Sequence, residues 1–122
     1  MRTVFVAIAI TVVQFALSVR AAEDLMIWGL GGASCAKYAK VFKENPDRAQ
    51  EALIDWAQGF MSGLNVGLQN ANMPTRNLSG STENLANMVM AGCDQRPLAL
   101  VLDLVRVYFE HLPLSNYRKP AQ

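Results

Sequence analysis

Histidine and cysteine are scarce in this sequence, which has one histidine, His111, and two cysteines, Cys35 and Cys93, among 122 residues. A zinc site of ordinary composition therefore cannot be assembled from one chain. A Cys–His nucleophile would need a free thiol close to His111. A free thiol is not expected if the protein is exported, as residues 1–21 predict below. The sequence also lacks a Ser-His-Asp order, an HExxH motif, an EF-hand loop and a dinucleotide fingerprint. We expect no enzyme, no metal and no cofactor.

Charge is also low, with 17% charged residues and a formal net charge of +1. If Arg2 and Arg20 are lost with an N-terminal leader, 11 Lys and Arg become nine, against 10 Asp and Glu. A near-neutral chain without a basic run offers no patch for nucleic acid and no polybasic site for a lipid surface. The expected partner is another protein, as a partner or a client.

Residues 1–21 have the pattern of a secretory signal peptide, with Arg2 as a short basic region and an apolar run over residues 4–17. The small residue Ala21 precedes the predicted cut, and a cut after Ala22 fits nearly as well. The uncharged stretch is short for an uncleaved anchor, since a membrane-spanning helix needs about 20 residues. We predict an exported domain over residues 22–122, without a stable membrane anchor after cleavage.

The two cysteines of an exported chain predict a disulfide between Cys35 and Cys93. The bond would close a loop of about 60 residues, which the chain-entropy model associates with roughly 4 kcal/mol of stability. For a domain of this size, that contribution is large enough to decide whether the chain folds. We therefore expect no free thiol in the oxidised protein.

Residues 46–70 predict one long central helix, with Asn45 as its N-cap and Pro46 at the first helical position. Apolar and small side chains recur at helical spacing over more than half of its circumference. This pattern is typical of a core helix. The residues that we expect to pack against other helices are Trp56, Gly59, Phe60, Gly63 and Gly67.

Gly59, Gly63 and Gly67 are unusual inside a helix, because each glycine costs about 1 kcal/mol relative to alanine. Their spacing of four residues would form a smooth groove for close packing inside the domain. A ligand-facing groove and a membrane helix pair of the small-xxx-small kind are the alternatives, and Asp55 and Gln58 argue against the membrane pair. Close packing predicts that Gly63→Leu destabilises the whole domain.

The remaining face of the central helix is polar, and we interpret it as a solvated stripe and a candidate interaction surface. Two carboxylates one turn apart within it could support acid–base chemistry, but a solvated face is the better interpretation. Substitution of Asn65 by alanine should therefore barely affect folding. The stripe consists of Glu51, Asp55, Gln58, Ser62, Asn65 and Gln69.

Three further helices are predicted, over about residues 35–44, 82–94 and 97–112. Ser34 and Ser81 are the expected N-caps of the first two, and Pro97 is expected in the first turn of the last. Residues 28–34 are glycine-rich, but they lack the strand, lysine and spacing of a phosphate-binding loop, so we expect a flexible loop with a buried Trp28. The predicted fold is all-α, a four-helix single domain around the central helix with one disulfide.

The layout resembles that of small exported proteobacterial helical proteins related to the acid-stress chaperones HdeA and HdeB. It is also similar to the Tai/Rap group of type VI immunity proteins, which neutralise cell-wall amidases. The resemblance covers most of residues 28–112 and includes Trp28, the pair Ser34-Cys35, the block Trp56 to Asn65 (WAQGFMSGLN), Cys93 and Pro97. In both groups the two cysteines pair, so only Cys35 and Cys93 carry over as site residues.

The resemblance implies a periplasmic, non-enzymatic protein-binding protein. One expectation is a chaperone that opens in acid, where protonation makes the chain strongly positive and weakens contacts made by carboxylates. A second is an immunity or inhibitor protein that neutralises a cell-wall amidase, and a third is an exported protein of no defined activity. Homodimer formation is a further possibility, because the related chaperones bury apolar surface by forming dimers.

Overall fold

The computed structural model describes residues 26–82 and 84–116, of which 67% are helical. A short 3₁₀ helix, η1 (Leu30–Gly32), precedes α1 (Cys35–Glu44), α2 (Pro46–Asn70), α3 (Leu85–Gln95) and α4 (Val101–His111). Within the described residues there is no β-strand, and the prediction of an all-α fold with four helices is confirmed. The predicted signal peptide, with its cut after Ala21 or Ala22, lies outside the described residues and stays a prediction.

The first two helices have the bounds that the sequence predicts, because local caps define them. Ser34 Oγ accepts a hydrogen bond from the Lys37 amide at 3.3 Å at the start of α1. Asn45 Oδ1 accepts one from the Arg48 amide at 3.2 Å at the start of α2, where Pro46 occupies the first turn. Each cap satisfies a backbone donor that has no partner within its own helix.

The last two helices begin later than predicted, at Leu85 in place of 82 and at Val101 in place of 97. Ser81, the expected N-cap of this helix, is buried and lies before the start of α3. Its carbonyl oxygen accepts a hydrogen bond from Tyr108 Oη. The Pro97 and Ala99 carbonyl oxygens accept from the Ala36 and Cys35 amides at 2.9 and 2.8 Å. The segment before α4 therefore caps α1, and this tertiary pairing overrides the local helix signal of Pro97.

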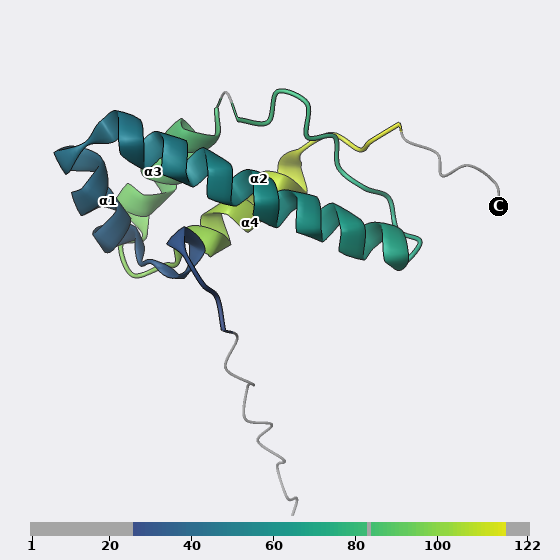
Figure 1. Cartoon of the computed structure of the whole chain (residues 1–122), viewed down its shortest axis with the longest axis horizontal. Helices are drawn as coiled ribbons and strands as arrows, with labels where there is room; N and C mark the ends of the chain where they lie inside the picture. Colours follow the sequence, from purple (N-terminus) through teal and green to yellow (C-terminus); the bar gives the residue numbers. More distant parts are fainter. Residues whose placement is uncertain (1–25, 83, 117–122) are drawn as a thin grey trace, which may run out of the picture.

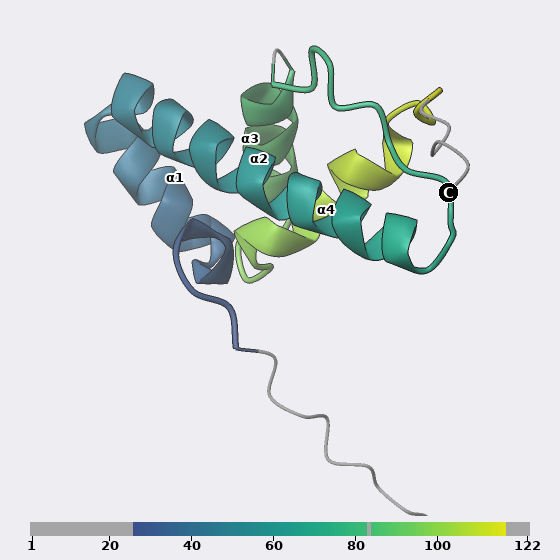
Figure 2. The ribbon, with the colours of Figure 1, turned by 45° about the vertical axis from the view of Figure 1, so that its right-hand side comes forward.

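The long α2 helix lies across the whole described part of the chain, with α3 and α4 behind it (Figures 1 and 2). It contacts η1, α1, α3 and α4, which confirms its predicted central place. α1 joins it through Asn45 and folds back along its first half. No other helix covers the face of α2 that points toward the viewer in either picture.

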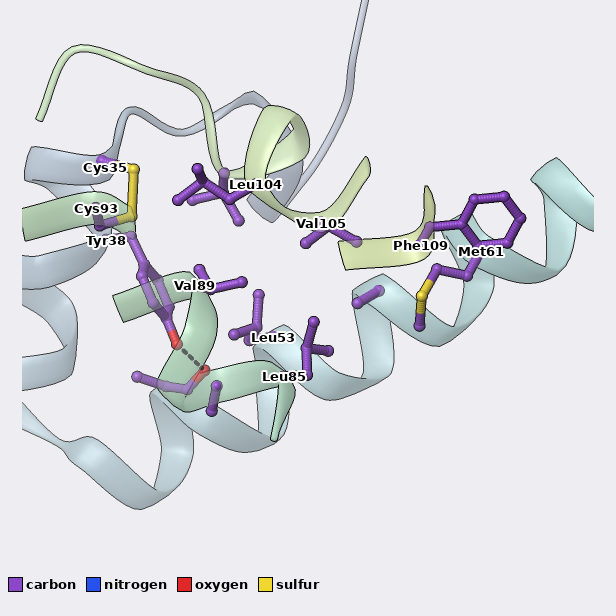
Figure 3. Close-up of a cluster of buried hydrophobic side chains, with 14 residues drawn as sticks. Cys35, Tyr38, Leu53, Met61, Leu85, Val89, Cys93, Leu104, Val105 and Phe109 are labelled. Atoms are coloured by element: carbon purple, nitrogen blue, oxygen red, sulfur yellow. Dashed lines mark hydrogen bonds between the residues drawn. A yellow bond between two sulfur atoms is a disulfide. The ribbon is translucent and has the colours of Figure 1, made fainter. Parts of the chain in front are cut away.

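The buried core lies between the inner face of α2 and the other three helices (Figure 3). The predicted disulfide joins Cys35 at the start of α1 to Cys93 near the end of α3, with a Cα–Cα distance of 4.8 Å. Tyr38 lies next to it, and its Oη donates to the Ala49 carbonyl oxygen at 3.3 Å across the α1–α2 pair. The largest fully buried side chains are Tyr38, Leu53, Met61, Leu85, Val89, Val101 and Val105.

The segment between α2 and α3 is anchored along much of its length. The Asn77 amide donates to the Pro113 carbonyl oxygen, and the Ser115 amide donates to the Thr75 carbonyl oxygen, each at 2.8 Å. Arg76 Nη1 donates to the Leu112 carbonyl oxygen at 3.0 Å. These bonds attach residues 75–77 to the end of α4 and to the residues that follow it.

Candidate functional site

Trp56 and Phe60 lie on α2 one turn apart, and both are half-buried against the core. Their rings are stacked, with centroids 5.1 Å apart and planes inclined by 11°. Trp56 Nε1 donates to the Trp28 carbonyl oxygen at 3.3 Å, which attaches the chain before η1 to the middle of α2. These two of the predicted packing residues therefore do contact the core, while part of each ring faces solvent.

The three glycines of α2 do not pack against any helix, so this prediction is wrong. Gly59, Gly63 and Gly67 are exposed, and a Cβ atom added to any of them would meet nothing within 4 Å. The reason is angular: Gly59 and Gly63 each lie two residues, or roughly 200°, from a buried residue of the inner face. Gly63 is separated in this way from Met61, which is fully buried.

Close packing on glycine occurs elsewhere, at Gly31 and Gly92. A Cβ atom on Gly31 would collide with the Trp56 indole ring, and one on Gly92 would lie 3.0 Å from the Leu104 methyl groups. Gly31 is buried in η1, within the segment that the sequence predicts to be a flexible loop. The sequence pattern thus indicates that glycine packing matters in this chain and assigns it to the wrong glycines.

Trp28 is 79% exposed, in contrast to the buried tryptophan expected from the sequence. It lines a hollow of about 560 Å³ together with Trp56, Gly59 and Phe60. Along α2 the same side of the helix continues through Gly63, Val66 and Gly67, and Val66 is 56% exposed. We call this the α2 outer surface: Trp28, Trp56, Gly59, Phe60, Gly63, Val66 and Gly67.

Val66 also belongs to this surface, although it is part of neither the predicted packing residues nor the polar stripe. It follows the polar stripe residue Asn65, and at helical spacing it lies beside Gly63 and Gly67. An exposed β-branched residue between two open glycines is a usable signal for an outward-facing apolar side. Trp28 gives no such signal, because its exposure depends on how the chain approaches η1.

The polar stripe of α2 is not one solvated surface. Glu51, Asp55, Gln58 and Ser62 are exposed, whereas Asn65 and Gln69 are half-buried. Asn65 Nδ2 donates to the Arg76 carbonyl oxygen and Asn65 Oδ1 accepts from the Arg76 amide, both at 2.8 Å. The interpretation of Asn65 as part of a solvated face is therefore wrong, since its side-chain amide is bonded to the backbone of the following segment.

The groups with catalytic potential are not brought together in the described part of the chain. Glu51 and Asp55 line a shallow hollow of about 350 Å³ on the exposed side of α2. His111 is exposed, and its Nδ1 lies 2.7 Å from the Val107 carbonyl oxygen. Both cysteine sulfurs are used in the disulfide, so neither forms a nucleophile with His111. No group of three or more His, Cys, Asp or Glu side chains there is arranged to hold a metal ion.

Among the described helices, none is both long enough and apolar enough to cross a membrane. Comparison of the sequence with protein-family models and curated proteins, and with solved structures, gives no match.

Proposed function

We propose that this chain is a periplasmic, non-enzymatic protein-binding protein of the HdeA-like kind, and that the α2 outer surface contacts its client or partner. The observation that carries the proposal is a side of α2 that holds apolar and small residues and is open to solvent, opposite the buried residues of the same helix. There, Gly59, Gly63 and Gly67 face solvent, and Gly59 lines the same hollow as Trp28, Trp56 and Phe60. Tryptophan is enriched among the residues that dominate protein–protein binding energy.

The glycines support a protein partner because nothing within the described chain uses their small size. Three glycines inside a helix cost roughly 3 kcal/mol relative to alanine. Without side chains at these positions, another polypeptide can approach the α2 backbone closely, as small residues allow at helix–helix contacts. Trp28 and Val66 lie at the two ends of this surface and offer side chains for an apolar partner.

This surface is open in the folded chain, so the proposal does not require that acid unfold the protein. Within the described residues a single salt bridge is present, between Arg106 Nη2 and Asp103 Oδ1 at 3.8 Å, and both side chains are substantially exposed. Exposed pairs contribute about 0–1 kcal/mol, so loss of this pair removes little stability. We expect binding at neutral pH as well as in acid.

The second candidate is an immunity or inhibitor protein that neutralises a cell-wall amidase. It is favoured by the preformed shape of the surface, most of which belongs to the 25-residue helix α2, whose inner face packs on the core. A preformed surface loses little freedom on binding and therefore suits one tight partner. The third hypothesis is that the chain is an exported protein of no defined activity.

The test is suppression of aggregation of a model client protein, measured by light scattering at neutral pH and at about pH 3. The variant Trp28→Ser/Val66→Ser changes only exposed side chains and should lose most of the effect. Leu98→Ser is the matched control, because Leu98 is 90% exposed and lies outside the α2 outer surface.

The outcomes separate the candidates. Equal suppression by both variants would contradict the assignment of the α2 outer surface. Absence of suppression at either pH, together with a stable neutral-pH complex with a cell-wall amidase on size exclusion, would replace the chaperone with the inhibitor. Failure of both assays would leave an exported protein without the proposed binding role.

A further inference from the structure

A second apolar depression lies on the molecule, separate from the α2 outer surface, where the C-terminal half of α2 meets α4 and the segment that follows α2. It has a volume of about 330 Å³ and is lined by the apolar residues Leu64, Leu68, Met73, Phe109 and Leu114. We call it the α2–α4 groove. Figure 1 shows α4 passing behind the middle of α2, and the segment after α2 running back from the end of α2 toward the end of α4. Its size falls within the range of about 300–1,000 Å³ that is typical of small-molecule sites.

The residues that line the groove include two arginines, Arg76 and Arg106, and one acidic residue, Glu110. These three residues have a formal charge of +1, and Asp103, which pairs with Arg106 at 3.8 Å, lies outside the lining. An anion in the groove would therefore meet two cationic residues if it takes the place of Asp103 at Arg106. A guanidinium group has five N–H donors in a planar fork and suits the two oxygens of a carboxylate. The lining therefore combines apolar walls with a cationic edge.

Arg76 is held in place before any ligand arrives. Its backbone amide and carbonyl are both bonded to Asn65 at 2.8 Å, and its Nη1 donates to the Leu112 carbonyl oxygen at 3.0 Å. Among the described residues, Arg106 forms an ion pair only with Asp103, at 3.8 Å, and this exposed contact is easily exchanged. One cation is therefore preorganised and the other is able to turn toward an incoming anion.

The backbone around the groove distinguishes an alkyl chain from a peptide. A peptide that binds as an added strand needs unpaired backbone donors and acceptors along one edge. Here the Arg76 amide, the Thr75 carbonyl oxygen and the Asn77 amide are already bonded to Asn65, Ser115 and Pro113. The walls offer mainly hydrocarbon side chains, which match a ligand that has no polar groups along its length.

We propose that the α2–α4 groove binds a single-chain alkyl carboxylate, with the chain between α2 and α4 and the carboxylate at Arg76 and Arg106. The apolar walls bury the hydrocarbon chain, and the two guanidinium groups bind its carboxylate. Glu110 limits the affinity for a dianionic head group by like-charge repulsion. This ligand is independent of the protein-binding role proposed above, since the groove shares no residue with the α2 outer surface.

The proposal is tested by titrating the oxidised protein with decanoate below its micelle concentration and measuring heat and methyl NMR shifts. Decanoate should bind and shift the Met73 methyl resonance. Decanol, which has the chain without the charge, should bind about tenfold more weakly, and decyltrimethylammonium should not bind in the groove. Equal binding of all three amphiphiles, or no binding of decanoate, would overturn the proposal.

The variant Arg106→Gln assigns the carboxylate contact without disturbing the core, because Arg106 is exposed. It should weaken decanoate binding by about tenfold and leave decanol binding unchanged, since only the carboxylate loses a charge-assisted hydrogen bond. Arg48→Gln is the matched control, as Arg48 is an exposed arginine of α2 outside the groove. If both variants bind decanoate as the unmodified protein does, the carboxylate does not lie at Arg106 and the proposal fails.

Discussion

The two faces of α2 contain the same classes of small and apolar residue, yet they have opposite environments. On the inner face, Ala49, Leu53, Ala57 and Met61 are buried at a spacing of four residues. On the outer side, three glycines at the same spacing face solvent together with Val66. The same spacing along α2 therefore does not lead to the same burial, because the buried face is the one on which the other helices pack.

The inner face should respond most strongly to truncation. Leu53 is fully buried in the centre of the core, so Leu53→Ala should lower the free energy of unfolding by about 2–5 kcal/mol through lost burial and a residual cavity. Chemical denaturation followed by circular dichroism measures this change. Gln58→Ala, at an exposed position of the same helix, should stay within about 0.5 kcal/mol. Comparable losses in both variants would contradict the inner-face assignment.

Asn65 should rank next, although its position belongs to the predicted solvated stripe. Asn65→Ala removes two hydrogen bonds and leaves the half-buried Arg76 amide and carbonyl without their partner, at a cost of about 1–3 kcal/mol. Ser62→Ala, one turn earlier and exposed, is the control. The measurement is the denaturation midpoint together with amide hydrogen exchange at Arg76. Unchanged exchange would mean that Asn65 does not fix this segment.

Gly63→Ala should have the opposite sign and stabilise the protein by up to about 1 kcal/mol. Alanine is the better helix former, and the added methyl group meets open space. The comparison with Gly31→Ala is the sharper test, because a Cβ atom at Gly31 would collide with the Trp56 ring. Gly31→Ala should therefore destabilise the protein by about 1–3 kcal/mol. Thermal melts of the two variants decide between them. Destabilisation by Gly63→Ala would restore the packing role predicted from the sequence.

A pH-dependent effect is expected at high pH, from Tyr38 in the core. Burial raises the pKa of the Tyr38 hydroxyl above its ordinary value of 10.0, because a phenolate would lose its solvation. The unfolded chain therefore loses this proton at a lower pH than the folded chain does. The stabilisation is complete below about pH 10 and declines as the pH rises toward the folded-state pKa.

Tyr38→Phe removes this ionisable group and should flatten the alkaline decline of stability. It also removes the hydrogen bond to the Ala49 carbonyl oxygen, so stability at neutral pH should fall by about 0.5–1.5 kcal/mol. The measurement is the free energy of unfolding between about pH 8 and pH 11. An equally steep decline in the variant would show that other groups control alkaline stability.

The sequence by itself determined the all-α class, the bounds of α1 and α2, and the pairing of Cys35 with Cys93. These features depend on local or combinatorial information. A cap acts over three residues, as Asn45 does on Arg48, and two cysteines allow a single intramolecular pair. The apolar excess of α2 likewise identified it as the central helix.

Only the tertiary structure decided which side of α2 is covered, where α3 and α4 begin, and what Asn65 and Gly31 do. Each of these outcomes depends on a partner distant in the sequence. The Ala36 amide binds the Pro97 carbonyl, the Tyr108 hydroxyl binds Ser81, and the Trp56 ring occupies the space above Gly31. Helical periodicity records the positions of side chains around one axis, but burial depends on the neighbours that meet that axis.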